Sequence, residues 1–131
     1  MLDKDNFQSE NHYKKFNELM DRAGVTFDDR SSTAMFYIVS GNKKLFEQVD
    51  EIYSFDNGIV KQDKKFILSK VNLPKKEEKM LRIALDLYNL FSSDSKEKNI
   101  YSIFKELKND KKIQLIITAF KITFISKKEY F

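Results

Sequence analysis

Few side chains in this sequence could carry out catalysis or hold a metal ion. His12 is the only histidine, and the chain contains no cysteine. The usual zinc sites need three or four histidine, cysteine or carboxylate ligands, so they cannot be built here. A catalytic histidine also needs a positioned partner. The sequence therefore predicts no metal site, and His12 is expected to be a packing or surface residue.

The carboxylates form short pairs rather than a catalytic arrangement. Asp28 and Asp29 are adjacent, as are Asp50 and Glu51, and Asp56 lies nearby. Adjacent residues on a helix do not face each other, so these pairs are typical of a solvated acidic surface. The sequence has neither a glycine-rich phosphate loop nor a nucleophile elbow. We therefore predict no catalytic residues, no cofactor and no enzymatic activity.

The basic side chains are unevenly distributed along the chain. Residues 1–60 hold 7 basic and 11 acidic side chains, whereas residues 61–131 hold 17 basic and 9 acidic ones. Such asymmetry is typical of a surface that binds nucleic acid or an acidic partner. The residues predicted to contact a partner are five lysines of one cluster: Lys61, Lys64, Lys65, Lys75 and Lys76.

A simpler interpretation of the lysines competes with a binding surface. Of the 24 basic residues, 21 are lysines, which is typical of an AT-rich coding sequence and of a solvated surface. Lys70 and Lys79 lie in the same cluster. Phe66, which lies among these lysines, could stack on a base, but a position in the core is the expected one.

The apolar pattern predicts an all-α fold. Three glycines and one proline favour long helices over a turn-rich β fold. Helical spacing occurs in six segments, which are residues 9–23, 26–40, 42–53, 73–91, 100–107 and 109–124. The second segment is apolar almost all round and should be central. Residues 59–70 are ambiguous: 59–60 and 66–68 could pair as a small hairpin, or the segment could be an ordered loop. We expect a compact bundle of about six helices, with residues 1–131 forming a single domain.

Capping residues set the expected helix boundaries. Ser9 is the expected N-cap of the first helix, and Gly24 is expected to end it. Thr26, followed three residues later by Asp29, resembles a capping box for the second helix. Gly41 is expected to end that helix, and Asn42 to cap the next one.

Nothing in the sequence predicts a membrane segment or an export signal. No run of 18 apolar residues occurs, and the N-terminus lacks the apolar stretch of a signal peptide. The absence of cysteine gives no support for secretion. We therefore expect a cytoplasmic protein without a membrane partner.

Several segments resemble an uncharacterised family of small proteins. These segments are His12–Phe16, Asp29–Arg30, Phe36–Asn42 and Ile52–Phe55. The family, a domain of unknown function, occurs in low-GC Gram-positive bacteria and in their phages and mobile elements. The resemblance implies a small helical protein and supplies no activity. Residues 61–79 do not match the family pattern.

A domain without catalytic groups acts through surface complementarity. We therefore expect a non-enzymatic protein–protein interaction module, and by analogy with other small phage proteins an inhibitor of a host defence or regulatory complex. The buried helix and the 18 aromatic residues would also suit a homodimer. One alternative is a nucleic-acid-binding accessory protein that uses the lysines of residues 61–79. Another is an enzyme of an unrecognised type.

Overall fold

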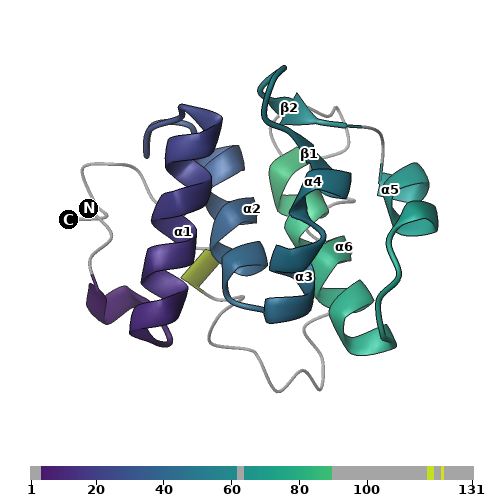
Figure 1. Cartoon of the computed structure of the whole chain (residues 1–131), viewed down its shortest axis with the longest axis horizontal. Helices are drawn as coiled ribbons and strands as arrows, with labels where there is room; N and C mark the ends of the chain where they lie inside the picture. Colours follow the sequence, from purple (N-terminus) through teal and green to yellow (C-terminus); the bar gives the residue numbers. More distant parts are fainter. Residues whose placement is uncertain (1–3, 62–63, 90–117, 120–121, 123–131) are drawn as a thin grey trace.

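The computed structural model describes residues 4–61, 64–89, 118–119 and 122 (Figure 1). The described residues are mostly helical, which confirms the expected fold class. They form a short 3₁₀ helix, six α-helices and a two-stranded hairpin, in the order η1 (Lys4–Asn6), α1 (Glu10–Ala23), α2 (Arg30–Ser40), α3 (Lys43–Glu47), α4 (Val49–Ile52), β1 (Tyr53–Ser54), β2 (Ile59–Val60), α5 (Lys64–Lys70) and α6 (Lys75–Asn89). None of the described helices is long and apolar enough to cross a membrane.

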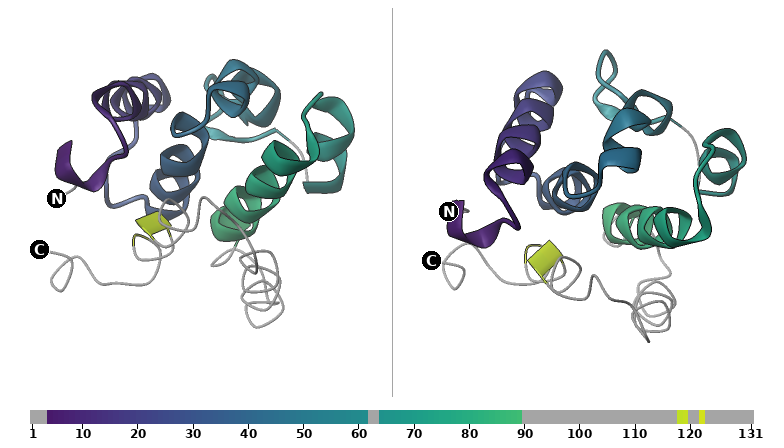
Figure 2. Two further views of the ribbon diagram at one scale, coloured as in Figure 1. Left: turned by 90° about the horizontal axis from the view of Figure 1, so that it is seen from below. Right: turned by 60° about the horizontal axis from the view of Figure 1, so that its bottom comes forward.

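Helix α2 is the centre of the bundle, as its apolar pattern predicts. Every residue from Ser32 to Ser40 is buried. Helix α2 packs against α1 on one side and against α6 on the other (Figure 2). Helix α6 supplies the widest apolar face opposite α2, with Met80, Leu81 and Leu85 fully buried. Burial of these side chains is the main stabilising contribution to the bundle.

Short-range hydrogen bonds set the helix boundaries. Ser9 caps α1 by accepting a hydrogen bond from the His12 backbone N–H at 3.1 Å, and Gly24 ends α1 with φ 66°. Asn42 caps α3 by accepting from the Leu45 N–H at 3.1 Å. These three predicted caps are therefore confirmed. The N-cap of α2 is Asp29 rather than Thr26, and it accepts from the Ser32 N–H at 3.1 Å.

The third predicted helix is broken into two short helices at Gln48. The backbone of Gln48 has φ −109° and ψ 16°, outside the helical range, so α3 ends and α4 begins at this residue. The Gln48 side chain leaves the helix surface to bond with the backbone of Asn72, which lies 24 residues further along. Because this contact is long-range, the apolar periodicity of residues 42–53 contains no sign of the break.

A small hairpin follows α4, but its strands are not the expected ones. Tyr53 pairs with Val60 and Ser54 with Ile59, in antiparallel orientation. Gly58 adopts φ 70° in the connecting turn, a conformation that favours glycine. Residues 66–68, for which pairing with 59–60 and an ordered loop were the two alternatives, lie instead in helix α5. A short apolar run has no periodicity that distinguishes a strand from a helix.

The last two predicted helices, 100–107 and 109–124, lie almost entirely outside the described residues. Thr118, Ala119 and Ile122 are helical where they are described. Ala119 and Ile122 are fully buried and belong to the same core as α2 and α6. The C-terminal part of the chain therefore contributes apolar side chains to the bundle.

Three tyrosines predict how stability depends on alkaline pH. Burial raises the pKa of Tyr37, Tyr53 and Tyr88 above the ordinary value of 10.0. Because these pKa values are higher in the folded state than in the unfolded state, the stabilisation is complete below the unfolded value and is lost as the pH rises through the folded values. We expect the contribution of these tyrosines to the free energy of unfolding to be constant below about pH 10 and to fall above it.

Urea unfolding at a series of pH values, with tyrosinate absorbance as a second signal, measures this effect. Tyr53→Phe removes one buried phenol at nearly constant volume, so the alkaline loss of stability should be smaller in that variant. Equal losses in the two proteins would contradict a contribution from Tyr53.

Candidate interaction groove

An open groove lies between the hairpin and α5. We call it the hairpin–α5 groove and define it by its lining residues, which are Glu51, Ser54, Asn57, Ile59, Lys61, Phe66 and Lys70. Its volume is about 420 Å³. Ile59 is 55% exposed and Phe66 45% exposed, and they are the exposed large hydrophobic residues of the described part of the chain. The groove therefore collects the apolar surface that the described core leaves uncovered.

Helix α5 is fixed to the bundle at its first residue. The Lys64 Nζ lies 2.7 Å from Oδ1 of Asp86 on α6, and the Asp86 side chain is only 3% exposed. Ile67, in the middle of α5, is fully buried. Lys64 therefore compensates a buried carboxylate, and this role differs from the partner contact that the sequence predicted for it.

The chain just after α5 is fixed by an amide side chain. Gln48 Nε2 donates to the Asn72 carbonyl at 2.8 Å, and Gln48 Oε1 accepts from the Asn72 N–H at 3.0 Å. One side chain thus bonds both polar groups of a single backbone residue, as a neighbouring strand would. With the ion pair at the other end, this arrangement holds Phe66 and Lys70 in fixed positions.

The hairpin wall of the groove is also attached to the bundle. The Lys61 N–H donates to the Ile52 carbonyl at 2.9 Å, which extends the pairing beyond Val60. The Val60 N–H donates to the Tyr88 hydroxyl of α6 at 3.4 Å. Both walls therefore rest on α6, and the groove is present before any partner binds.

The five predicted lysines are only partly brought together. Lys61 lines the groove, and Lys65 is exposed on α5 beside Phe66. Lys75 and Lys76 are exposed at the start of α6 and do not line the groove. Figure 1 shows α5 at the edge of the bundle farthest from α1.

Sequence reasoning missed several residues of the groove. Ile59 and Glu51 contribute from β2 and α4, whereas Lys70, which belongs to the predicted lysine cluster, lines the groove 5.4 Å from the centre of the Phe66 ring. The expected core position of Phe66 is wrong. Consecutive helix residues point in different directions, so the run Phe66–Leu68 cannot turn all three side chains inward. That run was the available sign that one of them would be exposed.

A comparison of two adjacent lysines tests the structural role of Lys64. Lys64→Met should lower the free energy of unfolding by about 1 to 2 kcal/mol, because it removes the positive charge that compensates the buried Asp86 carboxylate. The loss is limited because the Lys64 ammonium is partly exposed and solvent screens the ion pair. Lys65→Met, at an exposed position without a described ion pair, should change it by less than about 0.5 kcal/mol. Urea unfolding gives both values. Equal losses would contradict the assigned role.

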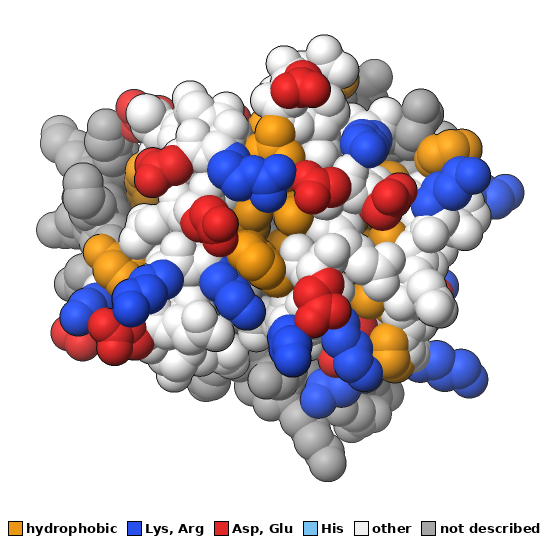
Figure 3. Space-filling model, viewed as in Figure 1, with side chains coloured by type: hydrophobic (Ala, Val, Ile, Leu, Met, Phe, Trp, Pro, Cys, Tyr) orange, Lys and Arg blue, Asp and Glu red, His pale blue; other side chains and the backbone are white. Residues whose placement is uncertain are grey.

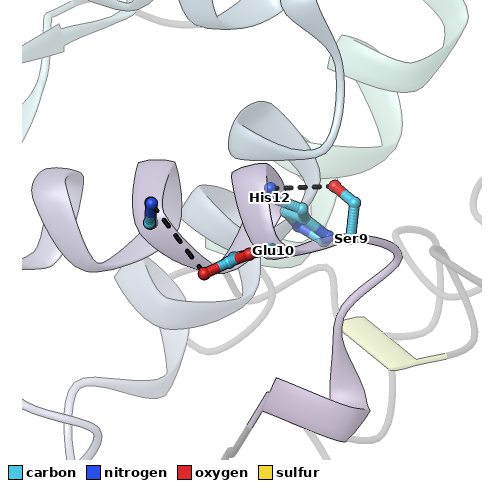
Figure 4. Close-up of polar contacts among 4 residues, drawn as sticks. Ser9, Glu10 and His12 are labelled. Atoms are coloured by element: carbon cyan, nitrogen blue, oxygen red, sulfur yellow. Dashed lines mark hydrogen bonds and ion pairs between the residues drawn. The ribbon is translucent and has the colours of Figure 1, made fainter.

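His12 is a packing residue. It is 3% exposed, its Nε2 donates to the Tyr37 carbonyl at 2.8 Å, and its Nδ1 accepts from the Gln8 N–H at 3.2 Å. Figure 4 shows the ring beneath the Ser9 cap, at the start of α1. Since both ring nitrogens are bonded to backbone groups, the geometry is that of a structural histidine.

The acidic residues form no metal cluster within the described ranges. Asp50 pairs with Arg22 at 2.8 Å, and the Arg22 guanidinium lies 3.9 Å from the centre of the Phe55 ring. Figure 3 shows this seam between α1 and α4 as a hydrophobic strip partly covered by basic side chains. Arg22 thus covers part of this seam and holds α1 against α4.

Comparison with known proteins gives a family but no activity. No curated protein and no solved structure matches the chain. A profile of a protein family matches residues 3–130, in agreement with the expected membership of an uncharacterised family. The match includes residues 61–79, so the expectation that this segment falls outside the family pattern is wrong. Since this match spans nearly the whole sequence, the chain belongs to DUF6075, a family of unknown function.

Proposed function

We propose that this protein is a non-enzymatic binding domain that contacts another protein through the hairpin–α5 groove. The observation that carries the proposal is the concentration of exposed apolar surface. Ile59 and Phe66 come from different elements and lie in one groove, whereas the other large hydrophobic residues of the described part of the chain are buried or half-buried. Exposed apolar surface of this kind, rimmed by polar residues, is typical of protein interaction sites.

The rigidity of the groove supports the same proposal. The bonds Lys64–Asp86, Gln48–Asn72 and Val60–Tyr88 fix both of its walls. A site that is already in place loses less conformational entropy on binding than a flexible one. Phe66 is the residue best suited to be an anchor, because aromatic side chains bury a large area at a low entropic cost.

Affinity capture with matched variants tests this function. The bait is the full chain, in lysate of the source organism, with and without nuclease. Ile59→Ser with Phe66→Ser should reduce recovery of a stoichiometric protein partner by about tenfold or more, because it removes the apolar anchors. Lys75→Ser with Lys76→Ser, outside the groove, should leave recovery unchanged. Recovery that survives loss of Ile59 and Phe66 would overturn the proposal.

Nucleic-acid binding is the second candidate, and one observation favours it. Phe66 is exposed among lysines, with the Lys70 ammonium 5.4 Å from its ring centre, which resembles a stacking platform in a basic surface. In that case nuclease would abolish recovery, and binding would weaken steeply with salt. Lys75→Ser with Lys76→Ser would then also reduce binding, because phosphate contacts extend over a wide surface.

The biological setting is the remaining part of the proposal. The sequence resemblance supports action in the cytoplasm of a low-GC Gram-positive cell, as a phage or mobile-element inhibitor of a host defence or regulatory complex. If the partner is a second copy of this chain, light scattering would detect a homodimer. The identity of the captured protein tests the setting separately from the groove.

A further inference from the structure

We infer that the partner inserts an acidic segment with one bulky apolar side chain into the hairpin–α5 groove. This inference rests on the proposed function and specifies the chemistry of the partner. The apolar side chain would contact Ile59 and Phe66, and its acidic neighbours would contact Lys61, Lys65 and Lys70.

The charge of the groove supports an acidic segment. Lys61 and Lys70 line it, and Lys65 is exposed on the same helix as Phe66. Within the described part of the chain, these three lysines form no ion pair. Helix α5 contains no acidic residue, and its remaining lysine is already bonded to Asp86. The positive charge around Phe66 is therefore uncompensated apart from Glu51 in the lining, and a partner with carboxylates would be attracted.

The apolar part of the groove supports a bulky side chain in that segment. Ile59 and Phe66 are each about half exposed, so a large part of both side chains is still in contact with water. The groove is open, with a volume of about 420 Å³, which is large enough to admit a side chain from an extended segment. Figure 3 shows hydrophobic and basic side chains next to each other at the α5 edge of the molecule. The groove would therefore bind the bulky apolar side chain and the neighbouring carboxylates of the partner segment at the same time.

The aliphatic part of the groove favours a protein segment over a nucleic acid. Ile59 has no aromatic face on which a base could stack. A base stacked on Phe66 would therefore leave the exposed surface of Ile59 uncovered. An aliphatic or aromatic side chain of a protein segment covers both Ile59 and Phe66.

The test uses a library of short random peptides displayed on yeast and selected against the folded full chain. The expected result is enrichment of Asp and Glu around a Phe, Leu, Ile, Met or Trp. Phe66→Ser should weaken the selected peptides by about tenfold or more through loss of the anchor contact. Lys61→Gln with Lys70→Gln should weaken them by about three- to tenfold and lower their salt dependence. Lys75→Gln with Lys76→Gln is the charge-matched control and should leave binding unchanged.

The outcomes separate this inference from the proposed function. Selected peptides that depend on Phe66 but lack acidic residues, or do not respond to Lys61→Gln with Lys70→Gln, would overturn the inference and leave the proposed function standing. Failure to select any peptide that depends on Ile59 or Phe66 would count against both. A random single-stranded oligonucleotide that displaces the peptides at physiological salt would assign the groove to nucleic acid instead. Circular dichroism of each variant establishes that it is folded.

Discussion

His12→Ala is expected to lower the free energy of unfolding by about 3 kcal/mol. The imidazole packs against Phe7 and Tyr37, with ring centroids 4.8 and 4.7 Å away. Its Nε2 also donates to the Tyr37 carbonyl in the last turn of α2, where carbonyl groups lack backbone donors and where the Ser40 hydroxyl is the other donor to this carbonyl. Alanine would remove the ring contacts and a hydrogen bond to a buried carbonyl at once.

Two further variants separate the histidine contribution from a general effect on α1. His12→Gln keeps a donor but loses the ring, and its stability should lie between those of wild type and His12→Ala. Asn11→Ala, at the exposed neighbouring position, should change the free energy by less than about 0.5 kcal/mol. Urea denaturation followed by circular dichroism gives all three values. A His12→Ala loss as small as that of Asn11→Ala would show that the ring is dispensable.

Asn42→Asp is expected to destabilise the protein by about 3 kcal/mol at neutral pH, although it replaces one good capping residue by another. In the wild type, the Asn42 Nδ2 donates to Oε2 of Glu77 at 3.0 Å, and Glu77 is buried on α6. Aspartate would keep the cap of α3 but would place a second carboxylate against Glu77. The cost is therefore electrostatic and comes from the contact between α3 and α6.

The pH dependence and a second substitution identify this cause. Two carboxylates in contact favour protonation of one of them, so the loss should become smaller as the pH falls. Glu77→Gln in the Asn42→Asp background provides a donor again and should restore most of the stability. Thermal unfolding of the four proteins of this cycle measures the coupling. A loss that is independent of pH and is not repaired by Glu77→Gln would point to backbone distortion instead.

The parts of the fold that could be predicted from the sequence are those encoded by local signals. Ser9, Gly24 and Asn42 act on backbone groups within a few residues, so their types alone indicate the helix ends. The uniformly apolar run of α2 requires burial on all sides, which places it at the centre. Helix α6 follows from its wide apolar stripe, which continues over several turns.

The parts that could not be predicted depend on contacts between distant residues. The helical pattern is interrupted at Gln48, whose side chain bonds the backbone of Asn72, 24 residues further along the chain. The segment after β2 forms helix α5, in which Ile67 is the one fully buried residue. A single buried position gives no apolar periodicity from which a helix could be predicted. The groove itself is assembled from α4, the hairpin and α5. The lysine cluster, which includes Lys61 and Lys70, indicated the right region, but the groove adds Ile59 and Glu51 and leaves Lys75 and Lys76 outside.

The way α5 is attached has a consequence for how sequences of this fold can diverge. The helix is held from its inner side by Ile67, Lys64 and Gln48, whereas Lys65, Phe66 and Lys70 are exposed. Mutations at the exposed positions should change the surface offered to a partner with little effect on the folded bundle. Natural selection can therefore alter binding specificity and stability almost independently, and homologues that keep the inner residues can acquire different partners on one scaffold.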